Sequence, residues 1–456
     1  MNIIRHTTKR SLTAAATQVV VQSLSGIALL LGTVGISAGQ NAITEWNEIG
    51  VTTALNGNLL ISPGSNTSGG TGIYLAYVHL AMYNAVNAIR HRYETYGGPP
   101  VPAPEGSKPE AAAIAAAYYT LKNYFPDQST TLAEKYSQAL SAIPAGPPRD
   151  RGVLVGNAAA LQLISMRSGD GRGAAVPYAY PAAPVAGVWI PTPPAFALPQ
   201  TPWVSQMAPF TMKSTSQFLP AEGPPPLWSQ QWADDFNQVQ ALGAVNSTVR
   251  SAEQTDIGRF WTDQTSKQYA RALRDLAVAR KLDLSESARL FAMVWPGFAD
   301  AFIGCMNAKY HFSFWRPVTA IRNGDIDGNA ATIADPAWTP LGATPNHPEY
   351  PAAHGCVTGS VAHVLNGFFR TRNFAFSAAS DIANLNQPVR KYNSTTALEN
   401  EVFVARIYAG FHYHHSLIQG FLLGHSVADQ LVAKFFRRVH GDGEKSDDDD
   451  RSDNEK

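Results

Sequence analysis

A proline-rich segment divides this chain and limits what it can fold into. Of the 31 prolines in 456 residues, 13 lie between Pro177 and Pro226. Proline lacks a backbone N–H donor and interrupts helices, so this stretch must be an extended, irregular connection. Its aromatic residues, among them Trp189, Trp203 and Phe210, indicate that it packs on the protein body. We therefore expect one helical half on each side of it.

Helical periodicity dominates on both sides of this connection. Apolar residues recur at three- and four-residue intervals between Leu75 and Ile89, and again between Ile418 and Phe435. Similar patterns predict further helices over Pro109 to Tyr124, Leu132 to Ile143, Gly152 to Ser168 and Ser287 to Lys309. Strand-like alternation is scarce, and the sequence therefore predicts an all-α fold.

The two ends of the chain differ from its body. Three basic residues and no acidic residue precede Glu45, and an apolar stretch runs from Val19 to Ala38. This pattern is typical of an export signal, so we expect a secreted or periplasmic protein; an N-terminal helix or an uncleaved membrane anchor is the alternative. No later segment reads as transmembrane. The expected organisation is an export signal (1–39), an N-terminal helical half (40–176), the Pro-rich connection (177–228), a C-terminal helical half (229–440) and a disordered acidic tail (441–456).

Composition excludes several classes of protein. The 35 basic and 35 acidic residues balance at a pI near 7.2, which argues against a nucleic-acid-binding protein. Two cysteines are too few for a disulfide scaffold or a multi-cysteine zinc module. Hydrophobic residues make up 45% of the chain, which excludes general disorder.

Three motifs in the C-terminal half concentrate the chemistry. Eight of the 12 histidines lie between positions 311 and 425. Around them the chain reads Lys309-Tyr-His-Phe-Ser-Phe-Trp-Arg316-Pro, then His347-Pro-Glu-Tyr-Pro-Ala-Ala-His354-Gly, then Arg406-Ile-Tyr-Ala-Gly-Phe-His412. Each motif sets cations or imidazoles beside aromatic or small residues.

The first motif calls for an anionic partner. Lys309 and Arg316 sit among aromatic residues, where an unpaired charge is costly. Pro317 disfavours helical geometry at Arg316, so the helix should end between the two cations. The alternative is a structural ion pair with Asp300 or Asp325.

The other two motifs add backbone amides and two histidines. Small residues before a helix starting at about Cys356 allow amides and a positive helix end to approach a ligand beside His354. A satisfied core or cap histidine is the alternative there. Arg406 and His412 are six residues apart, and they converge only if the helix breaks near Gly410.

Together these groups predict a pocket for a tetrahedral oxyanion. Arginine binds such anions through two N–H groups, lysine adds a point charge, and histidine serves as nucleophile, ligand or proton carrier. No carboxylates at metal-ligand spacing accompany the motifs. The histidines at 412, 414 and 415 are spaced poorly for a single zinc ion.

The three motifs resemble the signature of the vanadium-dependent haloperoxidases, part of the phosphatidic acid phosphatase type-two superfamily. That signature reads Lys-x6-Arg-Pro, Pro-Ser-Gly-His and Ser-Arg-x5-His, and this chain matches it in order and spacing. Segments such as Trp46-Asn47, Trp189-Ile-Pro-Thr-Pro and Glu253-Gln-Thr extend the likeness over nearly all of residues 43–440. The resemblance implies two four-helix-bundle-like halves, one pocket and vanadate as the cofactor.

The resemblance also implies a role for each matched residue. Lys309, Arg316, Arg406 and the amide of Ala353 would bind the equatorial oxygens of vanadate. His412 would be the axial vanadium ligand. His354 would take the proton from incoming hydrogen peroxide, and Lys309 would polarise the bound peroxide. The substrates would be hydrogen peroxide and halide, with a small organic molecule as a further acceptor.

His347 bears on the choice of halide. It precedes His354 by seven residues, where bromide-oxidising members carry histidine and the fungal chloride-oxidising type carries phenylalanine. By resemblance, bromide is expected to be preferred over chloride.

The chain departs from the family pattern at several positions. Ala352 replaces a serine that donates to an equatorial oxygen, and such a loss can weaken catalysis by roughly 10²–10³. Ser416 stands where members commonly place the aspartate that orients the axial histidine, so His412 is expected to have a weaker partner and lower basicity. If the first two motifs converge, Cys305 and Cys356 could form a disulfide; two free buried thiols are the alternative.

Two other functions fit the same motifs. Phosphate shares the shape and charge of vanadate, so the chain could be an acid phosphatase in which His412 attacks phosphorus and His354 protonates the leaving group. The third candidate is a non-catalytic oxyanion-binding protein, favoured by the missing serine at Ala352 and disfavoured by the two retained histidines. Oligomeric state is not readable from the sequence.

Overall fold

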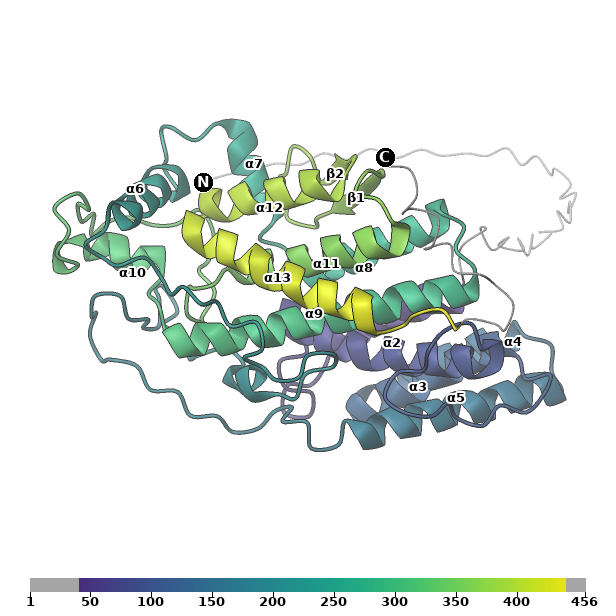
Figure 1. Ribbon diagram of the computed structural model, residues 1–456. Coiled ribbons are helices and arrows are strands. Elements are labelled where there is room, and N and C mark those ends of the chain that lie inside the picture. The colour runs from purple at the N-terminus through teal and green to yellow at the C-terminus, as the bar shows by residue number, and fades with distance from the viewer. Residues whose placement is uncertain (1–40, 440–456) are drawn as a thin grey trace, which may run out of the picture. The chain divides into compact units, whose positions relative to one another are not determined.

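Helices make up most of the part of the chain that the computed structural model describes, residues 41–439. The expected export signal and the last residues of the chain, including the expected acidic tail, lie outside this part. Within it the chain forms thirteen α-helices and a single two-stranded antiparallel sheet, so the prediction of an all-α fold is confirmed (Figure 1). The elements are α1 (Ala42–Leu55), α2 (Ser68–Arg90), α3 (Pro109–Tyr124), α4 (Ser129–Ser141), α5 (Pro147–Met166), α6 (Gln230–Gly243), α7 (Ala252–Phe260), α8 (Thr265–Ala279), α9 (Leu284–Phe312), α10 (Pro317–Arg322), α11 (Ala353–Phe369), β1 (Phe376–Ala379), β2 (Val389–Tyr392), α12 (Thr395–Tyr408) and α13 (His414–Lys434).

Helices α1, α3, α5 and α9 pack around the predicted apolar stripe of α2, and α4 packs on α3. Side chains from Gly69 to Ala88 are buried without interruption, because α2 contacts α3 and α5 as well as α9. Local signals set the helix ends: Asn41 forms a capping box at α1, and Pro109 occupies the first turn of α3. Helices α3 and α5 approach closely at Gly156, where a Cβ atom would lie 2.2 Å from the carbonyl oxygen of Ala112. No larger residue fits there without moving a backbone.

The Pro-rich connection contains no α-helix and runs along the body as an irregular segment. Its one regular element is a short 3-10 helix, η2 (Pro202–Gln206). Buried Asp300 of α9 holds it in place by accepting the backbone N–H groups of Phe210, Thr211 and Met212 at 2.6–3.0 Å, together with the Thr211 hydroxyl at 2.6 Å. Asp300 is therefore committed to this segment and does not pair with Lys309 or Arg316.

Helices α9, α11, α12 and α13 form the part of the fold that carries the three motifs. Helix α11 packs against α9, α13 and α12, and these helices lie next to one another in Figure 1. Small residues permit the close packing of α11 on α13: a Cβ atom at Gly424 would lie 2.1 Å from the carbonyl oxygen of Cys356. Among the described helices, α9 alone is long and apolar enough to cross a membrane, and it is buried along almost its whole length inside the protein.

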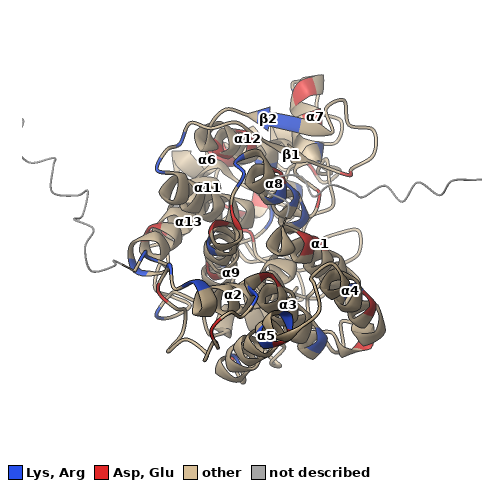
Figure 2. Cartoon of the chain, turned by 90° about the vertical axis from the view of Figure 1, so that its right-hand side faces the viewer, with Lys and Arg blue, Asp and Glu red and all other residues tan. Residues whose placement is uncertain are grey.

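Charged side chains do not gather by sign on the elements that Figure 2 shows. In that view, along the axes of several helices, basic and acidic segments are interspersed. The cations of the motifs are instead inside the protein: Lys309 and Arg316 are fully buried and Arg406 is 1% exposed.

Candidate active site

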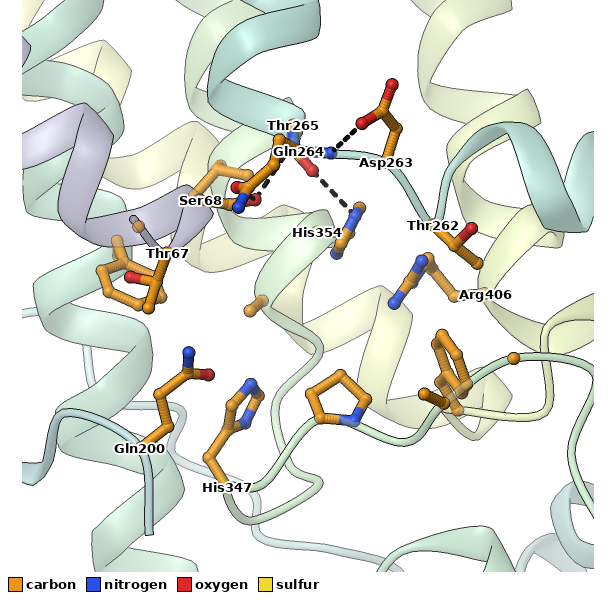
Figure 3. Close-up of a pocket in the computed structure, with 18 of the residues that line it drawn as sticks. Thr67, Ser68, Gln200, Thr262, Asp263, Gln264, Thr265, His347, His354 and Arg406 are labelled. Atoms are coloured by element: carbon orange, nitrogen blue, oxygen red, sulfur yellow. Dashed lines mark hydrogen bonds between the residues drawn. The ribbon is translucent and has the colours of Figure 1, made fainter. Parts of the chain in front are cut away.

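The ends of several helices enclose a cavity of about 560 Å³. Its wall is built from the start of α2, the loop before α8, the loop that leads into α11, the first turns of α11, and the chain from Arg406 to His412. Figure 3 shows His347, His354 and Arg406 directed toward this space from different sides. Five of the residues predicted from the sequence line the cavity: His347, Ala353, His354, Arg406 and His412.

Lys309 and Arg316 are not among the lining residues and lie behind the wall. Lys309 is in the last turn of α9, and Arg316 is the N-cap of α10, so the helix ends between them as predicted. Nζ of Lys309 donates to the carbonyl oxygens of Pro348 and Glu349 at 2.9 and 2.7 Å. Burial lowers the pKa of Lys309 to about 8. One of its three N–H groups remains uncommitted.

Arg316 joins the loop before α11 to the residues before α13. Its guanidinium donates to the carbonyl oxygens of His347 (2.8 Å) and Phe411 (3.0 Å), to Nδ1 of His347 (3.0 Å) and to Nε2 of His412 (3.3 Å). These contacts use four of its five N–H groups. Arg316 therefore fixes the two wall segments that carry His347 and His412.

Arg406 is the cation that reaches the cavity itself. It lies in the last turn of α12, and Gly410, at φ +77°, breaks the helix as predicted so that the chain turns back toward His412. One end of its guanidinium donates to the carbonyl oxygen of Trp261 at 2.5 Å. Its buried Nε has no hydrogen-bond partner among the described residues. Burial and the neighbouring Arg316 lower the pKa of Arg406 to about 9.

His412 has a buried carboxylate partner that was missed in the sequence. Its Nδ1 lies 2.8 Å from Oε1 of Glu349, which is 0% exposed. Glu349 also accepts the N–H of Tyr413 at 3.1 Å and the hydroxyl of Ser416 at 2.6 Å. The expectation of a weak orienting partner for His412 is therefore wrong, because Glu349 of the second motif contacts its ring from a different segment of the chain.

These contacts assign the tautomer of His412. Burial raises the pKa of Glu349 to about 7, against the effect of Lys309 and of the donors around it. In its ionised form Glu349 only accepts, so Nδ1 of His412 carries the proton. Arg316 can only donate, so the Nε2 atom that it contacts presents a lone pair. Burial, followed by Arg316 and Lys309, holds the pKa of His412 well below its usual range. His412 thus offers an unprotonated nitrogen at the cavity wall, with a carboxylate behind it.

His354 stands in the first turn of α11, which begins at Ala353. Its Nε2 lies 2.8 Å from the hydroxyl of Thr265, the first residue of α8 (Figure 3). Burial and the nearby Arg406 hold the pKa of His354 well below its usual range, so the ring is neutral at pH 7 and can accept a proton. At the start of the same 17-residue helix the first N–H groups have no intrahelical acceptor, and Ala352 provides no side-chain cap.

The available donors fit a buried tetrahedral oxyanion. They comprise the unpartnered Nε of Arg406, the first amides of α11 including that of Ala353, and the remaining N–H groups of Lys309 and Arg316 just behind the wall. A helix N-terminus favours negative charge, and arginine is suited to oxyanions. The lone pair of His412 Nε2 adds one ligand atom suited to a vanadium centre.

The known proteins that are similar to this chain include vanadium-dependent haloperoxidases. Residues 289–441 match the family model described as VCPO second helical-bundle domain. The chain is also 28% identical to vanadium chloroperoxidase from Curvularia inaequalis, over 46% of this chain. These matches support the resemblance of the chain to the vanadium-dependent haloperoxidases. The match spans only 42% of the length of the fungal relative.

Two solved structures of bacterial vanadium-dependent haloperoxidases share the fold. An iodoperoxidase aligns with a TM-score of 0.73 at 23% identity, covering 87% of this chain and 98% of that one. A holo-type chloroperoxidase aligns with a TM-score of 0.63 at 14% identity, covering 87% of this chain and 97% of that one. The chain therefore has the fold of these two structures.

Glu349 and Thr265 are the two contacts of the site histidines that sequence reasoning missed. Glu349 lies inside the second motif, between Pro348 and Pro351. An acidic residue at this position, close to His354, was a signal that could have identified it as a site residue. Thr265 carried no such signal, because it lies 89 residues before His354 and starts an otherwise ordinary helix. Cys305 and Cys356 are both free and buried in the structure.

Proposed function

We propose that this protein binds vanadate and oxidises halide with hydrogen peroxide, bromide more readily than chloride. The observation that carries the proposal is the buried, unpartnered Nε of Arg406 beside the carboxylate-backed lone pair of His412. A purely structural arginine at this depth would have every N–H group paired. Here the Nε of Arg406 has no partner among the described residues, and the unprotonated Nε2 of His412, contacted by Arg316 at 3.3 Å, belongs to a residue that lines the same cavity.

Each residue acts on the cofactor or on a proton. When bound, vanadate supplies an electrophilic centre that activates peroxide toward halide without changing its own oxidation state. Arg406 and the amide of Ala353 would hold its oxygens, and Lys309 and Arg316, behind the wall, would help to stabilise their charge. His412 would hold the metal through Nε2, with Glu349 maintaining the basicity and orientation of the ring.

His354 is the proposed acceptor for the proton of hydrogen peroxide. A low pKa keeps its ring neutral, and Thr265 fixes the ring at the cavity wall. Lys309, whose pKa is lowered to about 8, is still mostly charged at pH 7 and would supply positive charge from behind the cavity wall.

His347 supports the preference for bromide. Nδ1 of His347 lies 3.0 Å from Arg316, which can only donate, and 3.1 Å from the carbonyl oxygen of Pro348. We propose the tautomer in which Nδ1 accepts from Arg316 and the proton of the neutral ring lies on Nε2. Burial and the neighbouring Arg316 and Lys309 hold the pKa of His347 well below its usual range, and a neutral N–H donor remains at the cavity lining. Such a donor can hold a halide or an organic acceptor without adding a full charge.

The second candidate is a phosphatase that uses the same cavity. The contact between His412 and Glu349 favours it, because a histidine nucleophile needs a group that holds its proton on the far nitrogen. Phosphate would replace vanadate on the same donors, and His354 would protonate the leaving group.

One set of assays separates the candidates. Purified protein with and without orthovanadate is tested for halogenation of a phenolic dye with hydrogen peroxide and bromide, chloride or iodide, and for hydrolysis of nitrophenyl phosphate. Vanadate-dependent bromination that is lost in His412→Ala and retained in His414→Ala, an exposed neighbour, supports the haloperoxidase. Phosphate release that vanadate inhibits, without halogenation, would replace it with the phosphatase. Anion binding without either activity would leave the non-catalytic binding protein.

Location and domain organisation complete the proposal. The basic, then apolar, start of the chain supports export to the periplasm or the outside of the cell. We also propose that the cofactor site belongs to the half spanning residues 229–440, with the Pro-rich connection shaping the cavity mouth through Gln200. Secretion of the full-length protein, followed by N-terminal sequencing, tests the first part.

A further inference from the structure

The three helices that carry the cavity residues also carry a second group of metal-binding side chains. His363 of α11, Glu399 of α12 and His425 of α13 place one ligand atom each within 4.8 Å of one another. Asp429, one turn after His425, lies next to His363. None of the four lines the cavity, and the three side chains from the three helices are only partly exposed. These four residues are called the three-helix cluster below.

The three-helix cluster is already ordered by its own contacts. Nε2 of His425 lies 2.7 Å from Oε1 of Glu399, and Nδ1 of His363 lies 3.0 Å from Oδ1 of Asp429. The two imidazole rings stack at a centroid distance of 3.7 Å with 10° between their planes. Gly359 leaves room for the His425 ring, because a Cβ atom there would lie 3.0 Å from its Cδ2 atom. The two stacked rings present their nitrogens in nearly parallel planes, so the binding of one ion by both requires a rotation of at least one ring.

Charge in the three-helix cluster favours a cation. In the described part of the chain, Glu399 and Asp429 form ion-pair contacts with these histidines alone, and no lysine or arginine neutralises them. Two stacked imidazolium rings would repel each other strongly, whereas two neutral rings present nitrogen lone pairs. Neutral rings with two carboxylates give a local charge of −2, which a divalent ion balances.

We propose that the three-helix cluster binds one divalent transition-metal ion of the zinc type. The carboxylate of Asp429 contacts Nδ1 of His363, which leaves Nε2 of that ring as the ligand atom. A carboxylate that contacts the second nitrogen of a ligating histidine is the usual arrangement at zinc sites. Glu399 and His425 provide the other two ligands, the ion replacing the proton that they share. Imidazole with carboxylate suits zinc, nickel or cobalt, whereas calcium and magnesium prefer oxygen ligands alone.

The positions along the helices give the ion a structural role. His363 follows His354 by nine residues on α11, and Glu399 precedes Arg406 by seven on α12, which are about 13 and 10 Å along the helix axes. The ion is therefore too remote to take part in chemistry in the cavity. It links α11, α12 and α13, the neighbouring helices of Figure 1 whose ends hold the site.

Calorimetry on the untagged full-length protein tests this site independently of the proposed function. After removal of metals with EDTA, titration with zinc chloride in phosphate-free buffer is expected to show one equivalent bound with a Kd below about 10 µM. His363→Asn and His425→Asn should each weaken binding at least about tenfold. Bound zinc should raise the Tm by at least about 2 °C.

Two controls make the result specific. His311→Asn removes an exposed histidine outside the three-helix cluster, and His354→Ala removes one from the cavity; both should keep the bound equivalent. Cobalt bound at the site should show the visible absorption of a tetrahedral complex, and this absorption should be lost in Glu399→Gln. Because Glu399 is partly exposed, this variant tests the site even if a histidine variant fails to fold. Unchanged zinc affinity in all three cluster variants, a Kd weaker than about 1 mM, or loss of the equivalent in His354→Ala would overturn the proposal.

Discussion

Replacing Glu349 with glutamine isolates what the buried carboxylate does for His412. Glutamine matches glutamate in shape but has no charge, and one of its two terminal atoms is a donor instead of an acceptor. In the structure, Glu349 accepts from His412, Tyr413 and Ser416 at 2.6–3.1 Å, so the variant loses the charge and sets a donor against one of these groups. The ring of His412 then loses both its fixed tautomer and part of its basicity.

Two opposing effects follow for anion binding, and their magnitudes can be separated. Loss of an outer carboxylate behind a ligating histidine weakens metal binding by about 10–100-fold. Removal of a negative charge across an imidazole ring, roughly 7 Å away, strengthens the binding of any anion by about 2 kcal/mol at an effective dielectric near 20. The second effect acts on vanadate and phosphate alike, whereas the first acts only on the anion that His412 ligates.

The ratio of the two affinities therefore reports the ligand role of His412. Calorimetric titration of wild type and Glu349→Gln with orthovanadate and with inorganic phosphate is expected to show the preference for vanadate falling about 10–100-fold. Ser416→Ala keeps the carboxylate and removes one hydrogen bond, about 1 kcal/mol, so its ratio should change by about fivefold or less. An unchanged ratio in a folded Glu349→Gln protein would refute a ligand role for His412 that depends on Glu349.

Three further substitutions test other parts of the structure. Burial raises the pKa of the Asp235 carboxyl group to about 6, so this group binds its proton more tightly in the folded protein than in the unfolded chain. Ionisation of Asp235 therefore destabilises the folded state, and the destabilisation increases as the pH rises from about 4 to 6. Asp235→Asn should add about 2 kcal/mol at pH 7 and nothing below pH 4 in urea unfolding; equal effects at both pH values would contradict this. Gly410→Ala should lower stability by about 2–4 kcal/mol in the same assay and reduce anion affinity, since Gly410 has φ +77° and a Cβ atom would lie 2.7 Å from the carbonyl oxygen of Gly243. His347→Phe removes the acceptor of Arg316 and the N–H at the cavity, and it should lower the ratio of bromide to chloride oxidation several-fold; a constant ratio in steady-state kinetics would exclude His347 from halide selection.

Local patterns were enough to predict most helices. The stripe from Leu75 to Ile89 lies inside α2, and Pro109 to Tyr124 coincides with α3. The break at Gly410 was also predictable, because glycine tolerates the positive φ that turns the chain between Arg406 and His412. Each of these features depends on residues a few positions apart, which is the range over which helix geometry acts.

The same patterns could not predict contacts between residues that are distant in the sequence. Glu349 reaches His412 across 63 residues, and Thr265 reaches His354 across 89. Neither contact has a spacing that periodicity can reveal, because loop paths are set by what they pack against. The start of α11 shows the same limit: the helix begins at Ala353, three residues before the predicted position.

By itself, the sequence determined the all-α fold, the irregular Pro-rich connection and the three motifs whose cations and histidines needed an anion. Tertiary structure alone decided that Arg406 reaches the cavity while Lys309 and Arg316 lie behind its wall. Tertiary structure likewise decided that Glu349 orients His412, which was expected to have a weaker partner. It also decided that His363, Glu399 and His425 meet on three different helices. The physical reason is that spacing along a helix fixes the face on which a residue lies, whereas the packing of helices and loops fixes which faces meet.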